Sequence, residues 1–191
     1  RNETRKVKRM KDKRSKRRLK LSDYVILAML AAMGIASKVI IVPLAQAITG
    51  PLFIPGGVVA GGFFMMFLVL GTAITGKFGA ALFISLIQAV LVTITGTFGS
   101  HGAASLVTYV FPGLAVELWF LVSRHRGCCP MCCFVAGLVA NVAGTFAVNV
   151  AIFNLSFVPL MLSLLVAALS GGLGGLAASS IARSLERLGI L

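Results

Sequence analysis

The sequence carries little charge, and very little of that charge is negative. Of its 191 residues 12% are charged, and only five are Asp or Glu against 18 Lys and Arg. Soluble domains are about a quarter charged and about half apolar, whereas this chain is 58% hydrophobic with a mean hydropathy of +0.99. The composition excludes an ordinary water-soluble domain and indicates an integral membrane protein.

The motifs of several kinds of chemistry are also missing. The sequence has no GxxxxGK[ST] loop, so ATP hydrolysis by that route is excluded. It has no HExxH or GxSxG motif, and no pair of acidic residues lies within an apolar segment. We therefore expect no enzyme activity, no cofactor and no bound metal. If the protein transports anything actively, the energy must come from partner subunits or from an ion gradient.

The positive charge is concentrated at the N-terminus, where residues 1–20 hold 12 of the 18 Lys and Arg. This basic run is too long for a cleavable signal peptide. The first aromatic residue is Tyr24, so the run lacks the interleaved aromatics that stack on nucleic-acid bases. We expect residues 1–21 to form a disordered cytoplasmic arm that can attract anionic membrane lipids but binds no nucleic acid.

Residues 22–191 are expected to form one all-α transmembrane domain. Six apolar segments approach the roughly 20 residues that a helix needs to cross the bilayer. They span about 24–43, 58–75, 80–96, 103–122, 131–153 and 158–182. With this count the loops 45–57, 97–102 and 154–157 carry no charged residue, and every short loop with Lys or Arg falls on the other side. Both termini are therefore predicted to be cytoplasmic.

Small residues recur at four-residue spacing in three of these spans. Such stripes allow helices in lipid to approach closely. The stripes are Ala28, Ala32 and Ala36 in the first span, Gly57 and Gly61 in the second, and Gly171 with Gly175 and Gly174 with Ala178 in the sixth. They predict packing within the chain, although the first stripe could equally dock another membrane subunit.

Polar side chains inside the spans predict a binding pocket, because such groups are costly in lipid unless they are paired or hydrated. Asn141, Thr145 and Asn149 share one helix face. The polar groups all lie between mid-membrane and the outside, which indicates a pocket that opens outward; helix-to-helix hydrogen bonds without a ligand are the alternative. The candidate substrate-binding residues are Gln46, Phe53, Gln88, Thr95, Ser100, His101, Tyr109, Asn141, Thr145 and Asn149.

Two charged residues lie within the predicted spans. Lys38, in the outer part of the first span, can extend its side chain to the surface or meet an anionic group of a substrate. Glu117 lies near the cytoplasmic end of the fourth span, where we expect it to pair with Lys77 or Arg124.

All four cysteines fall between Cys128 and Cys133, at the predicted cytoplasmic edge. Cys129 and Cys132 have the CxxC spacing of redox and zinc sites, but a zinc tetrad normally joins two separated pairs. We expect an unreactive helix start here. A membrane metal or redox protein that uses the Cys128–Cys133 cluster remains an alternative.

These segments resemble the substrate-binding membrane subunits (S-components) of energy-coupling factor (ECF) vitamin transporters, and among them the YkoE-like branch. The resemblance is carried by the alanine stripe, by PLFIPGGVVAGG at 51–62, by GTFGSHGAASLVTYVFPGL at 96–114, by the fifth span around Asn141 and by SGGLGG at 170–175. An ion-coupled secondary transporter is an alternative, but the chain lacks the repeated halves typical of that class.

The resemblance implies a prokaryotic plasma-membrane importer for a vitamin or vitamin precursor, such as thiamine, hydroxymethylpyrimidine or another small heteroaromatic. It implies that Ala28, Ala32 and Ala36 dock onto a transmembrane coupling subunit, which works with two cytoplasmic ATPases. It further implies that the loaded subunit topples in the membrane to release its substrate inside. A cationic thiazolium would be poorly served, because no acid faces the predicted pocket.

Overall fold

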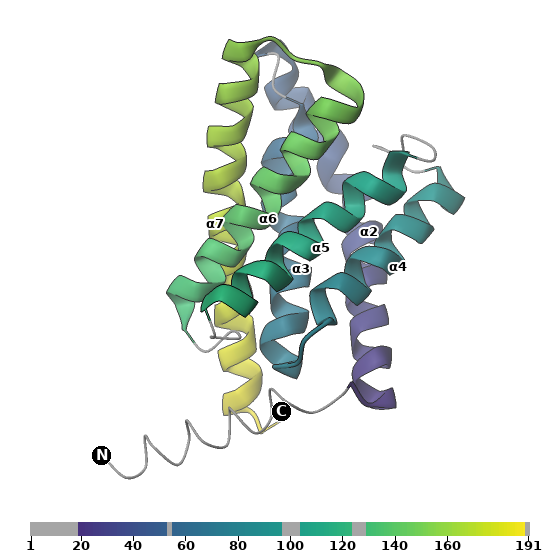
Figure 1. Ribbon diagram of the computed structural model, residues 1–191, viewed down its shortest axis with the longest axis vertical. Helices are drawn as coiled ribbons and strands as arrows, with labels where there is room; N and C mark the ends of the chain where they lie inside the picture. The colour runs from purple at the N-terminus through teal and green to yellow at the C-terminus, as the bar shows by residue number, and fades with distance from the viewer. Residues whose placement is uncertain (1–18, 53–54, 97–103, 124–128, 190–191) are drawn as a thin grey trace.

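The computed structural model describes residues 19–52, 55–96, 104–123 and 129–189, and these are almost entirely helical (Figure 1). The helices are α2 (Leu21–Thr49), α3 (Gly56–Thr75), α4 (Ala80–Thr95), α5 (Ala104–Ser123), α6 (Pro130–Val148) and α7 (Phe157–Arg187). A 3₁₀ turn at Gly50–Leu52 follows α2, and a π-helical segment at Asn149–Phe153 follows α6. The predicted N-terminal arm lies outside the described residues, apart from its last three.

Each predicted span corresponds to one of these helices, so the expectation of an all-α membrane protein is confirmed. Five of the helices are long and apolar enough to cross a membrane, while α4 is apolar but shorter. The main difference lies in α2, which continues through Pro43 to Thr49 into a segment predicted to be a loop. Proline is tolerated in membrane helices, and the Thr49 hydroxyl donates to the Ala45 carbonyl oxygen at 3.0 Å.

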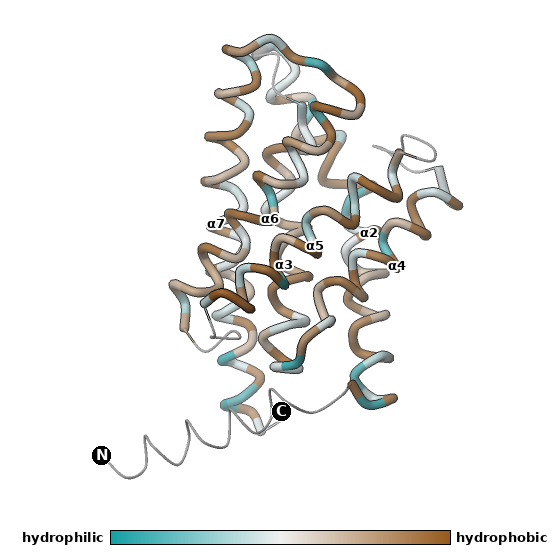
Figure 2. Tube along the Cα trace, in the orientation of Figure 1, coloured by the Kyte–Doolittle hydropathy of each residue, from teal (hydrophilic) through white to brown (hydrophobic). Residues whose placement is uncertain are grey.

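The bundle has two distinct ends. At the terminal end α2 begins and α7 finishes, and the α3–α4 turn also lies there (Figure 1). This turn falls between the second and third predicted spans, and Gly76 and Gly79 in it both adopt the left-handed backbone conformation that glycine favours. The distal end carries the α2–α3 and α6–α7 connections. Figure 2 shows hydrophilic residues near the start of α2 and the end of α7, with mostly hydrophobic helix middles between.

Close contacts among α3, α6 and α7 form the tightest part of the bundle. A Cβ added to Gly174 would collide with the backbone oxygen of Gly62, and one added to Gly137 would collide with that of Gly171. The Ser170 hydroxyl on α7 donates to the Val59 carbonyl oxygen on α3. The glycines of the sixth predicted span therefore pack inside the chain. Gly57, by contrast, has nothing within 4 Å of the position of a Cβ.

The alanine stripe of α2 is left largely uncovered. Ala28 is half-buried, whereas Ala32 and Ala36 are exposed. The neighbouring residues Ala31 and Ile35 are buried and turn the opposite face of the helix toward the core. The stripe therefore remains free to contact another protein or lipid.

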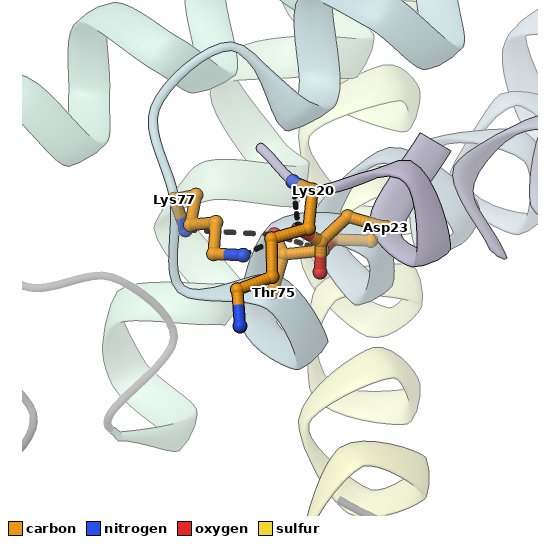
Figure 3. A network of polar contacts seen from close by, with 5 residues as sticks. Lys20, Asp23, Thr75 and Lys77 are labelled. Atoms are coloured by element: carbon orange, nitrogen blue, oxygen red, sulfur yellow. Dashed lines mark hydrogen bonds and ion pairs between the residues drawn. The ribbon is translucent and has the colours of Figure 1, made fainter. Parts of the chain in front are cut away.

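One of the two ion pairs predicted for Glu117 does not form. Lys77, in the α3–α4 turn, forms an ion pair with Asp23 in the first turn of α2 (Figure 3). Asp23 also accepts a hydrogen bond from the Lys20 backbone N–H at 2.6 Å. The predicted pairing of Glu117 with Lys77 is therefore wrong, and Arg124 lies outside the described residues.

Glu117 instead interacts with the first turn of α4. Its carboxylate accepts a hydrogen bond from the Ala81 backbone N–H at 3.0 Å. The free N–H groups and the partial positive charge at a helix N-terminus favour a carboxylate in this position. The short helix α4 is thereby joined to α5 near the terminal end.

The glycine contacts predict a position-specific sensitivity to added methyl groups. Gly174→Ala should lower the free energy of unfolding by about 1–3 kcal/mol, because the new methyl group overpacks the α3–α7 contact. Gly57→Ala is the matched control and should be neutral or slightly stabilising, since alanine favours helix and nothing lies near. Thermal unfolding of both variants in detergent would measure this, and equal effects would contradict the packing described.

Candidate functional site

A cavity of about 570 Å³ lies in the distal half of the bundle. Its volume is within the range of small-molecule sites, about 300–1,000 Å³. Its walls come from the distal parts of α2 and α6, from α3 as far as Leu68, and from the first two turns of α7. The middle of α4 and the first half of α5 complete the lining. Most of the lining is apolar, and the polar side chains in it are Lys38, Gln46, Gln88, Thr108, Tyr109, Asn141, Thr145, Asn149 and Ser163.

Three of these polar side chains hold the wall of the cavity together. Asn141 donates both amide hydrogens, to the Val58 carbonyl oxygen on α3 at 3.1 Å and to the Ala167 carbonyl oxygen on α7 at 2.9 Å. The Gln46 side-chain oxygen accepts from the Gly56 backbone N–H and closes the α2–α3 connection. The Asn149 side-chain oxygen accepts from the Leu155 backbone N–H at 2.8 Å across the π-helical segment.

Three other polar groups have no hydrogen-bond partner among the described residues. They are the amide nitrogen of Gln88, the hydroxyl of Tyr109 and the hydroxyl of Ser163, and all three are buried. They come from α4, α5 and α7, and all three residues line the same cavity. Buried polar atoms are almost always hydrogen-bonded. Three unpartnered atoms around one cavity are therefore the feature most suggestive of a ligand.

Lys38 adds a positive charge to the cavity lining. Lys38 is only 8% exposed, and its ammonium nitrogen lies 4.5 Å from the centroid of the Tyr109 ring. An ammonium group over an aromatic face is stabilised by a cation–π interaction. The side chain is thus held between α2 and α5 rather than extended to the surface.

Of the ten predicted site residues, six line the cavity: Gln46, Gln88, Tyr109, Asn141, Thr145 and Asn149. Thr95 does not, because it is exposed at the end of α4 and its hydroxyl donates to the Leu91 carbonyl oxygen at 2.7 Å. Phe53, Ser100 and His101 lie outside the described residues.

Ser163 and Thr108 were not among the predicted site residues, although both line the cavity. A signal for Ser163 exists in the sequence. It lies four residues before Ala167 and eight before Gly171, so it extends the small-residue face of α7 by two turns. That face packs against α6 as far as Gly171, and at Ser163 it opens onto the cavity.

Cys129, Cys132 and Cys133 lie at the start of α6 and are not part of the cavity lining. The Cys129 and Cys132 sulfurs are 2.7 Å apart, and the Cys129 sulfur also accepts from the Cys132 backbone N–H at 3.4 Å. Among the described residues, no group of three or more His, Cys, Asp or Glu side chains is arranged to hold a metal ion. Cys128 lies outside the described residues.

The two kinds of polar residue predict effects of different size on stability. An interhelical hydrogen bond in a membrane protein contributes about 0.6 kcal/mol on average and up to about 1.7 kcal/mol. Asn141→Leu removes two of them and should lower the free energy of unfolding by about 1–3 kcal/mol. Ser163→Ala removes none and should change it little. Thermal unfolding without ligand would test this, and an Asn141→Leu variant as stable as the wild type would contradict the role of Asn141 in the wall.

Comparison with known proteins bears on both fold and family. A solved structure described as an S-component of an ECF transporter matches with a TM-score of 0.75, over 91% of this chain and 88% of that chain. The two sequences are 22% identical, so this match establishes the fold, which is the one the sequence resemblance implied. No curated protein matches the sequence significantly. Residues 22–143 match a family model described as the permease component of an ABC-type cobalt transport system, and the chain belongs to that family.

Proposed function

We propose that this chain is the substrate-binding membrane subunit of an ECF-type ABC importer, and that it captures a small organic molecule in the distal cavity. The observation that carries the proposal is the set of unpartnered buried atoms of Gln88, Tyr109 and Ser163 around that cavity. A bound molecule with polar atoms would supply the missing hydrogen bonds. The family of permease components and the S-component fold support the same function.

The proposed orientation follows from the charges. The basic side chains of the described helix ends and turns are Lys20, Lys77, Arg183 and Arg187, and all four lie at the terminal end. The distal connections have no charged residue in the sequence. The positive-inside rule therefore supports cytoplasmic termini and a cavity that faces the outside of a prokaryotic plasma membrane.

The chemistry of the lining favours an organic substrate. The family description refers to cobalt, but the described residues that line the cavity offer amides, hydroxyls and one lysine as polar groups, with no carboxylate among them. Divalent metal ions prefer carboxylate, imidazole or thiolate ligands. The aromatic and aliphatic walls, including Phe64 and Leu68, suit a vitamin or vitamin precursor of the heteroaromatic kind that the YkoE-like resemblance implies.

Transfer of the substrate would depend on partner subunits. The chain lacks a nucleotide-binding loop, so two cytoplasmic ATPases would supply the energy through a transmembrane coupling subunit. The exposed Ala32 and Ala36, with Ala28, offer a flat face for that subunit. Docking there would let the loaded protein topple in the membrane and release its substrate inside.

Native mass spectrometry of the detergent-purified protein tests the capture function. We expect a small organic molecule that is released on denaturation and identifies the substrate. The variants Gln88→Met, Tyr109→Phe and Ser163→Ala should each weaken its binding about 2- to 10-fold, the loss expected for one hydrogen bond, and should leave thermal stability nearly unchanged.

A Cys129→Ser/Cys132→Ser double variant is the matched control, because these cysteines lie outside the cavity lining. It should retain the same molecule with the same affinity. Failure of the purified protein to release or bind any organic molecule would refute the capture function. A metal that is bound by the wild type and lost in the cysteine variant would favour the metal or redox alternative.

The docking face gives a separate prediction. Ala32→Trp and Ala36→Trp should abolish copurification with a coexpressed coupling subunit, because the indole prevents close helix approach, and should leave substrate binding intact. Leu165→Trp, at an exposed position of α7, is the control and should copurify normally. If both alanine variants still copurify, the alanine stripe is not the docking face.

A further inference from the structure

Lys38 has no negatively charged partner in the part of the chain that the structure describes. Its ammonium group lies in the cavity wall against the Tyr109 ring, and the residue is 8% exposed. The one ion pair found among the described residues joins Lys77 to Asp23. A charge within the membrane region almost always has a partner or lines a water-filled cavity.

The three acidic residues of the helical domain either lie far from Lys38 or interact with another part of the chain. Asp23 lies 15 residues before Lys38 on the same helix, about 22 Å away at 1.5 Å per residue. Glu117 accepts a hydrogen bond from the first turn of α4. Glu186 is exposed in the last turn of α7, at the terminal end. None of the three carboxylates is therefore available to neutralise Lys38.

The contact with Tyr109 compensates only part of the cost of this charge. A cation–π interaction is weaker than the cost of removing an ammonium ion from water. An anion that enters the cavity would gain a counter-charge in Lys38. The attraction between the two charges would be stronger in this water-poor cavity than in bulk water.

Two unpartnered hydrogen-bond donors line the cavity beside the part of α2 that carries Lys38 or beside its side chain. The unpartnered Gln88 amide packs against Gly34, one helical turn before Lys38 on α2. The unpartnered Tyr109 hydroxyl belongs to the ring that Lys38 contacts. An ammonium, an amide N–H and a phenol O–H together can bind the oxygens of a carboxylate or phosphate. The apolar part of the lining, with Phe64 and Met65, would then contact the organic body.

We propose that the captured substrate carries an anionic oxygen group, a carboxylate or a phosphate, which binds to Lys38. This inference rests on the proposed function and narrows it to organic anions. Cationic ligands such as thiamine are excluded by the same lysine, because their charge would be repelled within a cavity that offers no carboxylate.

The test compares probes that differ in charge but little in shape. Isothermal titration of the purified full-length protein would use nicotinate against nicotinamide, pantothenate against pantothenol, biotin against its methyl ester, and pyridoxal 5′-phosphate against pyridoxal. Thiamine and neutral hydroxymethylpyrimidine complete the set. We expect at least one acid to bind, about 30-fold or more tightly than its neutral counterpart. The carboxylate and phosphate pairs distinguish the two anionic groups.

Lys38→Met should remove this preference for the acid, and Lys38→Arg should keep part of it. The comparison of probes on the wild type needs no variant, so it stands even if Lys38→Met does not fold. Tight binding of hydroxymethylpyrimidine or thiamine, unchanged in Lys38→Met, would overturn the anion inference and leave the capture function intact. If no probe binds and no molecule is released on denaturation, both are overturned.

Discussion

Helices α3, α6 and α7 approach so closely that glycine backbone stands where any side chain would collide. Helices in lipid gain no hydrophobic energy from contacting one another, so such close packing and interhelical hydrogen bonds must hold them. Asn141 exploits this closeness, because its amide reaches backbone carbonyl oxygens on both neighbouring helices. The position of the cavity wall depends on this three-helix contact.

The terminal and distal halves of the bundle differ in what fills their interiors. In the terminal half, apolar side chains such as Leu27 and Phe120 fill the interior, and the charges of Asp23 and Glu117 are bound to groups of the protein. In the distal half, α2 and α6 continue beyond the packed core and line an open space with polar groups. The terminal half therefore provides a densely packed base, and the distal half leaves hydrogen-bonding capacity for a ligand.

The charge of the distal half is the unusual element of this arrangement. A charged lysine in a mostly apolar cavity is unfavourable on its own, yet Lys38 is held there by its contact with the Tyr109 ring. A protein that binds its substrate only transiently benefits from such an incomplete site, because the substrate supplies the interactions that the empty protein lacks. The same incompleteness would make the loaded and empty forms differ, as a transport cycle requires.

The sequence by itself determined the membrane class, the order of the helices and the turn at 76–79, because hydropathy and glycine punctuation are local properties. It also indicated six of the polar residues that line the cavity. Only the tertiary structure decided what each of them does. Asn141 and Gln88 are both mid-span amides, yet Asn141 bonds to two neighbouring helices while the Gln88 nitrogen has no partner among the described residues. That difference depends on how closely the helices approach at each position. The contact of Glu117 with α4 rather than with Lys77 depends on the same distances. No local sequence pattern encodes the distance between two helices.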